Sequence, residues 1–352
     1  MFFEGLGTAV PKRRYTQAEC LEAFQNAPVF ARLERRSQVL LRKVLLGDNG
    51  IATRHFALDA IGDTFELTPD MLHARFAQHA PALAEAAARN ALREAGVTAE
   101  AVDAVIASTC TGYLCPGLTS YVSERLGLRR NVLALDLVGQ GCGAAMPNLR
   151  AAEALIAANR SARVLSVCTE VCSAASYLDD DPGVLISACL FGDGAAAAVL
   201  SGEPSPQQRN VRWHTAGTTF SAEDRDYLRF DQRDGKLRNL LGRQVPTLAA
   251  KHAETVLTET LTRTELSREQ IMGWVLHGGG RDVLSALRDR LGLREEHVRC
   301  SREVLRDCGN MSSPSVLFAL QRALAANQPG GWWWLSSFGA GFSCHGALLR
   351  VD

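Results

Sequence analysis

The chain alternates short apolar runs with longer segments in which apolar residues recur every three or four positions. Runs of the first kind predict buried strands, and the longer spacing predicts helices that pack on them. Met1–Val10 fits a first strand, and residues 132–138 fit a buried strand followed by an alanine-rich helix that ends near Ala158. Because strands that alternate with helices are typical of layered proteins, we expect an α/β fold.

The order of these predicted elements occurs twice in the chain. A helix end, a short capped helix and a strand surround Thr98 and Val105, and the same order recurs about 168 residues later around Ser267 and Trp274. Thr98 and Ser267 take the same N-cap position in the two copies. The pattern therefore indicates an internal duplication.

The same offset continues toward the C-terminus. The predicted strand at residues 163–170 corresponds to the one at residues 331–338. We therefore expect two similar halves, residues 1–205 and 206–352, packed about a pseudo-twofold axis. A crevice at strand ends between two such halves is a common place for chemistry.

Cys142 lies where the predicted strand gives way to the alanine-rich helix. A thiol at a helix N-terminus is close to unpaired backbone N–H groups, which favour the thiolate. The flanking Gly141 and Gly143 allow a tight turn and the close approach of a substrate. A cysteine in an apolar stretch is, however, often an inert core residue. The duplication adds Asn310 as the symmetry mate of Cys142.

His277 follows a predicted strand and precedes three glycines, and the counterpart strand ends near residues 108–110. An imidazolium beside the sulfur of Cys142 would hold it as thiolate. The amide of Asn310 donates without titrating, so that two donors aimed at one point could stabilise an enolate or oxyanion. The alternatives are a structural histidine and a simple N-cap for a helix beginning at Met311. The three residues together favour catalysis.

Composition excludes several classes of protein. The 352 residues carry 38 Lys and Arg against 38 Asp and Glu, so no net field favours nucleic acid or an anionic membrane. No secretory leader and no apolar run of about 20 residues is found, so we expect a cytoplasmic protein without a membrane span. The ten cysteines do not include two matching, closely spaced pairs of the kind that bind structural zinc. We therefore expect reduced thiols and no metal.

Several motifs together resemble those of chalcone-synthase-like (type III) polyketide synthases. They are Gly309-Asn-Met-Ser-Ser313, Leu190-Phe-Gly-Asp-Gly-Ala-Ala196 and Ser337-Phe-Gly-Ala-Gly-Phe342, together with Gln140-Gly-Cys142 and His277-Gly-Gly-Gly280. The resemblance spans about residues 85 to 352 and is weaker at the N-terminus. It implies a layered α/β/α/β/α thiolase fold and a homodimer.

The resemblance also implies a Cys142–His277–Asn310 triad and an acyltransferase without a permanently bound cofactor. Cys142 would take an acyl group from a coenzyme A thioester. His277 and Asn310 would polarise the carbonyl of malonyl-CoA, so that CO₂ leaves and an enolate attacks the acyl-cysteine. Repeated rounds and a cyclisation would follow.

Further residues are carried over from the family to this sequence. Phe191 matches one gatekeeper phenylalanine, and the second falls near Arg238 or Asn239. Ala340 replaces a proline of the terminal loop, and Gly278 follows His277 where plant enzymes usually have proline. The residues expected to contact the substrate are Phe191, Cys110, Cys115, Cys172, Ala175, Arg238, Phe338, Gly339 and Gly341.

Coenzyme A needs cations for its phosphates. The candidates are Arg42, Lys43 and Arg54, with the Arg35–Arg36 pair nearby and Gly279 at the cavity, although a solvated helix face explains any one of these cations equally well.

The small residues expected in the cavity favour a long acyl starter and an alkylpyrone or alkylresorcinol product. The segments around Cys172 and Tyr227–Asp231 also resemble bacterial enzymes that make dihydroxyphenylacetyl-CoA from malonyl-CoA alone. A ketoacyl-synthase III-like enzyme, performing one condensation or acyl transfer, shares the fold and triad type. A catalytically silent thiolase-fold subunit is the remaining alternative, and the intact triad argues against it.

Overall fold

The computed structural model describes residues 1–65, 68–205 and 209–352. Among these residues, nine strands form one sheet that divides into two half-sheets, and the two halves pair with each other at Phe2–Arg212 and Phe3–Val211, where β1 meets β8. The first half-sheet contains β1 (Phe2–Ala9), β7 (Gly194–Ser201), β6 (Val164–Glu170), β4 (Ala104–Thr109) and β5 (Leu133–Val138). The second contains β8 (Val211–Phe220), β13 (Ser343–Val351), β12 (Gly331–Gly339) and β11 (Ile271–Leu276).

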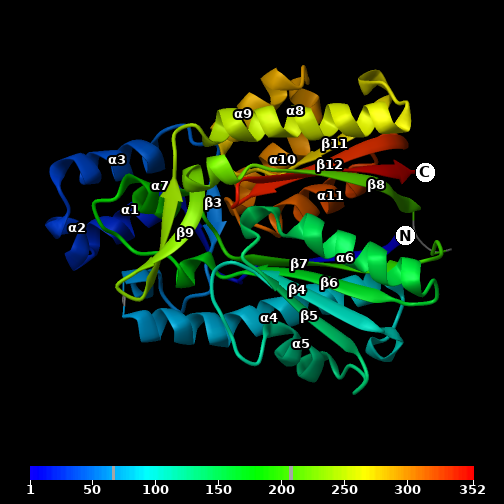
Figure 1. Ribbon diagram of the computed structural model, residues 1–352. Coiled ribbons are helices and arrows are strands. Elements are labelled where there is room, and N and C mark those ends of the chain that lie inside the picture. The colour runs from blue at the N-terminus through cyan, green and yellow to red at the C-terminus, as the bar shows by residue number, and fades with distance from the viewer. Residues whose placement is uncertain (66–67, 206–208) are drawn as a thin grey trace.

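The helices complete five layers, which Figure 1 shows from the side. Between the half-sheets lie α6 (Ala145–Ala158) and α11 (Ser315–Ala325), whose apolar faces form the central core. The outer face of the first half-sheet is covered by α4 (Pro69–Ala95) and α5 (Leu118–Leu126). The outer face of the second is covered by α8 (Val245–Thr264) and α9 (Arg281–Arg290). Helix α10 (Glu295–Cys308) contributes to both the central and the second outer core.

The strand order reads almost the same from both ends of the sheet. From the centre outward, β1, β7, β6 and β4 correspond to β8, β13, β12 and β11, and only β5 has no counterpart. Thr98 and Ser267 both precede one turn of 3₁₀ helix that leads into β4 and β11. The predicted pair of similar α/β halves is confirmed. The expected boundary between residues 205 and 206 stays a prediction, because residues 206–208 lie outside the described part of the chain.

The strand predicted at residues 132–138 forms, as β5, but it is not buried. It pairs only with β4 and ends the sheet, and Leu133 and Val138 are 44% and 55% exposed. An apolar sequence predicted a central strand because periodicity alone does not reveal which strand ends a sheet.

A cluster of helices and two small sheets lie beside the layered body. The helices α1 (Gln17–Asn26), α2 (Pro28–Arg32) and α3 (Arg35–Leu46) pack with α7 (Pro182–Leu190) around a separate apolar cluster. The strands β2 (Arg14–Thr16) and β3 (Thr53–His55) form one two-stranded sheet, and β9 (Leu228–Arg233) and β10 (Lys236–Leu241) form another. Figure 1 shows all of these at one end of the layers.

Candidate active site

Cys142 lies in a single turn of 3₁₀ helix, Gly141–Gly143, between β5 and α6. Gly141 has a φ of +57°, which side chains rarely adopt, and a Cβ there would lie 3.0 Å from the backbone N of Ala340. A Cβ on Gly143 would lie 3.2 Å from the ring of His345. The two glycines therefore let the nucleophile turn pack closely against Ala340 and His345, while the predicted close approach of a substrate stays a prediction.

His277 is the first residue after β11 and is only 1% exposed. Neither ring nitrogen has a hydrogen-bond partner among the described residues. Phe338 contacts the ring edge to face at a centroid distance of 5.1 Å. A Cβ on Gly279 would lie 3.5 Å from Nε2 and 2.8 Å from the ring of Phe338, so Gly279 keeps space open beside the imidazole.

Asn310 follows α10, and both its backbone and its side chain form hydrogen bonds. Its backbone N–H donates to the carbonyl of Leu190 at 2.9 Å, and its Oδ1 accepts from the backbone N–H of Ser312 at 2.8 Å. Its Nδ2 donates to the carbonyl of Gly279 at 3.1 Å. An amide has two N–H groups, so one remains for a substrate oxygen. The helix begins at Ser315, not at Met311, so Asn310 is not its N-cap.

These three side chains line one cavity of about 790 Å³, together with Phe191 and Phe338. The structure therefore brings together Cys142, His277 and Asn310, which come from segments more than 30 residues apart. Their catalytic roles stay a prediction at this point. The arrangement fits a nucleophile with two potential hydrogen-bond donors beside it.

Two residues that were not among the candidates are connected to the sulfur, Ser312 directly and Glu170 through Ser312. Ser312 donates from Oγ to Cys142 Sγ at 3.2 Å and lies 3.3 Å from Oε1 of Glu170. Glu170 is fully buried at the end of β6 and accepts from Ser313 Oγ at 2.7 Å and from the backbone N–H of Cys110 at 2.9 Å. The one charged residue at the end of a strand without other charges was the signal that could have identified it.

Burial determines the protonation of the candidate pair. It raises the pKa of Cys142 to about 12, against the hydrogen bond from Ser312, which lowers it, while Glu170 raises it further. Burial also lowers the pKa of His277 to about 4. Burial therefore favours a neutral thiol on Cys142 and a neutral imidazole on His277, in place of the expected thiolate and imidazolium, because desolvation penalises both charged forms.

A second, closed pocket lies beyond Phe191. It has a volume of about 20 Å³, and its lining includes Cys110, Cys172, Ala175, Phe191 and Asn239. Four of the residues expected to contact the substrate are thus placed on one pocket, and Asn239 rather than Arg238 takes the position near the expected second gatekeeper.

Two expected substrate contacts are not in either pocket. Cys115 is exposed, because the loop after β4 carries it outward. Arg238 forms a two-pronged hydrogen bond with Asp231 instead, because it lies on the opposite face of β10 from Asn239. Neither residue lines these two pockets within the single chain, and contact of either with the substrate stays a prediction.

The two glycines of the terminal loop take different places. A Cβ on Gly339 would lie 2.5 Å from the carbonyl of Gln140, so Gly339 supports the nucleophile turn. Gly341 has a φ of +131° and lines a third cavity of about 540 Å³ that shares Cys110 with the closed pocket.

The residues expected to bind coenzyme A also lie in different places. Lys43 on α3 and Gly279 line the large cavity, whereas Arg42 is exposed outside its lining. Arg54 is 1% exposed and donates to Gln17 Oε1 at 3.0 Å and to the carbonyl of Ala188 at 2.6 Å, which corrects its assignment to coenzyme A. Arg243 also lines the large cavity and was missed.

Comparison with known proteins agrees with this geometry. The profile of the N-terminal domain of chalcone and stilbene synthases matches residues 5–204, and that of the C-terminal domain matches residues 214–351. The chain therefore belongs to the chalcone and stilbene synthase family. It is a type III polyketide synthase, an acyltransferase with the thiolase-like fold. This family uses coenzyme A thioesters as substrates.

Bacterial proteins are among its relatives. The 3,5-dihydroxyphenylacetyl-CoA synthase of Streptomyces toyocaensis is 31% identical, over 98% of this chain and 89% of the relative. The synthase of the same name from Amycolatopsis orientalis is 30% identical, over 99% and 93%.

Two solved structures have the same fold over their whole length. PKS-I from the brown alga Ectocarpus siliculosus superposes with a TM-score of 0.90 at 28% identity, over 99% of this chain and 98% of that chain. The 1,3,6,8-tetrahydroxynaphthalene synthase of Streptomyces coelicolor A3(2), a bacterial type III polyketide synthase, superposes with a TM-score of 0.88 at 25% identity, over 100% and 99%. Within the described residues, no helix is long and apolar enough to cross a membrane.

Proposed function

We propose that Cys142 carries the growing acyl chain while His277 and Asn310 promote decarboxylation of malonyl-CoA. The observation that carries this proposal is that the three side chains line one cavity, with a free ring nitrogen on His277 and one free amide N–H on Asn310. Donors aimed at one oxygen stabilise the negative charge that develops there.

Loading begins with the thiol. As Sγ of Cys142 attacks the thioester carbonyl, the neutral imidazole of His277 accepts the thiol proton, and coenzyme A leaves with a proton. The low pKa of His277 then favours return of that proton to the leaving sulfur. The product of this step is an acyl-cysteine.

Extension needs no strong base. A malonyl thioester loses CO₂, and its bonding electrons form an enolate whose oxygen accepts hydrogen bonds from Asn310 and His277. The enolate carbon attacks the acyl carbonyl, and the sulfur of Cys142 leaves. Transfer of the lengthened chain back to Cys142 permits another round.

The mouth of the large cavity supports the use of coenzyme A. Lys43 from α3 and Arg243, just before α8, both line it, and neither has an ion-pair partner within residues 1–65, 68–205 and 209–352. Arg281 also lines it but pairs with Asp48 at 3.3 Å. We infer that Lys43 and Arg243 contact the phosphates, a role that the sequence analysis assigned to Lys43 but not to Arg243.

The closed pocket and the relatives support a short product built from malonyl-CoA alone, of the 3,5-dihydroxyphenylacetyl-CoA type. The pocket beyond Phe191, at about 20 Å³, adds no room for a long alkyl chain, so the product would be built in the cavity of about 790 Å³ that holds the triad, a size typical of pockets for small organic ligands, about 300–1,000 Å³. Two of the bacterial relatives carry that name. The alkylpyrone or alkylresorcinol product stays a prediction that would require this pocket to enlarge.

We also infer a homodimer that forms through β5. This strand leaves a row of unpaired backbone groups and the apolar side chains of Leu133 and Val138 at the edge of the sheet. Exposed apolar edge strands of soluble proteins are usually covered, and pairing with a second copy would cover this one.

The test supplies malonyl-CoA alone and, in parallel, malonyl-CoA with acyl-CoA starters of increasing length. We expect CO₂ release and an aromatic C8 thioester or its acid, detected by mass spectrometry, without any starter. Products formed only with long starters would instead support the alkylpyrone assignment, and a single ketoacyl product would support a ketoacyl-synthase III-like reaction. Cys142→Ala is the matched control, and condensation that survives it would contradict the covalent mechanism.

A further inference from the structure

The β9–β10 hairpin separates two cavities. Phe230 and Leu237 line the closed pocket of about 20 Å³ beyond Phe191. The same two side chains also line the cavity of about 540 Å³ on the other side, which shares Cys110 with the closed pocket. Because Cys110 and Thr111 also line both spaces, the hairpin is one of two segments whose position determines whether the spaces are separate or continuous.

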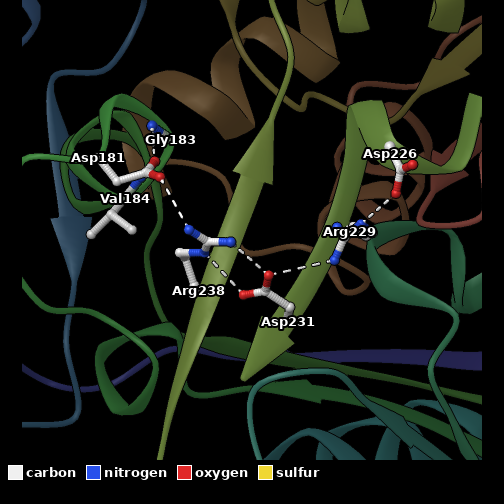
Figure 2. Close-up of polar contacts among 7 residues, drawn as sticks. All are labelled: Asp181, Gly183, Val184, Asp226, Arg229, Asp231 and Arg238. Atoms are coloured by element: carbon white, nitrogen blue, oxygen red, sulfur yellow. Dashed lines mark hydrogen bonds and ion pairs between the residues drawn. The ribbon is translucent and has the colours of Figure 1, made fainter. Parts of the chain in front are cut away.

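Charged side chains along the hairpin form a continuous chain of ion pairs, which Figure 2 shows. Arg238 and Asp231 are directly opposite each other across the two strands, with Arg238 Nε at 3.0 Å and Nη2 at 2.7 Å from the carboxylate. Arg229 lies 3.6 Å from Asp231 and donates to Asp226 at 2.7 Å. Arg238 and Asp231 are about a quarter exposed, at 22% and 28%.

The chain of ion pairs continues onto α7. Arg238 Nη1 lies 3.8 Å from Asp181, the N-cap of α7, which accepts from the backbone N–H of Gly183 at 2.8 Å. Asn239 of the hairpin donates to Ser187 Oγ in the same helix at 2.8 Å. A Cβ on Gly183 would lie 2.6 Å from the carbonyl of Asn239, so helix and hairpin are in direct backbone contact.

Helix α7 connects this contact to the catalytic residues. It ends at Leu190, whose carbonyl accepts from the backbone N–H of Asn310 at 2.9 Å. Phe191 follows directly and forms an isolated parallel bridge with Asn310. Displacement of the hairpin would therefore change both the shape of the pocket and the position of Phe191, the expected gatekeeper.

We propose that the ion chain Asp181–Arg238–Asp231–Arg229–Asp226 clamps the β9–β10 hairpin over the closed pocket and so limits the length of the acyl chain that the enzyme builds. Arg238 and Asp231 are positioning residues that act through Phe230 and Leu237. Release of the clamp would let these two side chains move and join the closed pocket to the larger cavity. The limit on chain length rests on the proposed function, whereas the clamping of the hairpin does not.

The test uses Arg238→Gln and Asp231→Asn, with Arg233→Gln as the matched control. Arg233 is an exposed cation on the same hairpin and has no ion-pair partner within the described residues. The first readout is the rate at which iodoacetamide labels Cys172, which lines the closed pocket and is 4% exposed. We expect labelling about threefold faster in the two clamp variants, as for the loss of a partly exposed ion pair, and unchanged labelling in the control.

The second readout is the distribution of product lengths and accepted starters, by mass spectrometry. We expect the clamp variants to accept longer starters and form longer products, with the KM for malonyl-CoA within about twofold of wild type, because Lys43 and Arg243 are untouched. Arg238→Lys keeps one charge but not the two-pronged bond, and should restore part of the wild-type distribution.

Each outcome decides the proposal. Folded clamp variants that label Cys172 at the wild-type rate would overturn the clamp. Faster labelling with an unchanged product distribution would overturn its control of chain length. If the variants do not fold, wild-type protein in about 1 M salt, where screening acts within about 3 Å, must show the faster labelling. A wild-type enzyme without CO₂ release would overturn the proposed function, while the labelling still decides the clamp.

Discussion

Replacement of Asn310 by alanine removes one defined donor from the proposed enolate site. In the structure one amide N–H donates to the carbonyl of Gly279 at 3.1 Å, and the other has no partner among the described residues and can donate to the thioester oxygen. Loss of one such donor lowers turnover by about 100- to 1,000-fold, or about 2.7–4 kcal/mol in the activation barrier. We therefore expect CO₂ release from malonyl-CoA to fall by this factor.

The same variant also removes two hydrogen bonds within the protein. Oδ1 accepts from the backbone N–H of Ser312 at 2.8 Å, and that N–H would be left buried. We expect a loss of about 1–3 kcal/mol in the free energy of unfolding, measured by urea denaturation. Labelled CO₂ release from malonyl-CoA, measured on folded protein, separates the two effects. A folded Asn310→Ala enzyme that releases CO₂ within threefold of wild type would refute the assignment of the donor.

Three further substitutions test other parts of the account. Arg54→Met should lower the free energy of unfolding by about 3 kcal/mol without a selective rise in the KM for malonyl-CoA. The reason is that Arg54 donates to buried oxygens rather than to coenzyme A. A higher KM at unchanged stability would contradict this. His345 has its pKa lowered to about 4 by burial, so its neutral form adds stability above pH 6.5 that is lost as the pH falls toward 4. In His345→Gln the free energy of unfolding, measured by urea denaturation, should therefore fall less over this pH range, by up to about 3 kcal/mol. A fall equal to that of the wild-type protein would contradict the burial argument. Leu133→Lys should convert a dimer to a monomer in light scattering, and a monomeric wild-type protein would contradict pairing through β5.

Local signals predicted the positions of the main candidates. Cys142 precedes a helix and His277 ends a strand, and both features depend on neighbouring residues in the sequence. The internal repeat then added Asn310, because similar halves place equivalent residues near one axis. These inferences needed no knowledge of distant contacts.

The errors share a different cause. Arg54 looked like a phosphate ligand, but Gln17 and the end of α7 surround it, and nothing near it in the sequence indicates this. Glu170 was passed over because its donors come from two segments far from it in the sequence, residues 109–111 and 312–313. The protonation of Cys142 was misjudged because burial, unlike a helix start, cannot be read from local sequence.

The closed pocket also required the structure. The sequence suggested free space at Cys110, Cys172 and Ala175, since their side chains are small. In the folded protein the β9–β10 hairpin brings Phe230 and Leu237 into that space. The size of a pocket depends on the elements opposite it as much as on the residues that line one wall.

The central claim is that Cys142 carries the acyl chain during synthesis. Wild-type enzyme is mixed with malonyl-CoA, quenched with acid during turnover and digested, and the peptides are analysed by mass spectrometry. We expect acetyl and longer ketoacyl adducts on the peptide that contains Cys142, and none on the corresponding peptide of Cys142→Ala. Adducts confined to another cysteine, such as Cys110, or products formed by Cys142→Ala would contradict it.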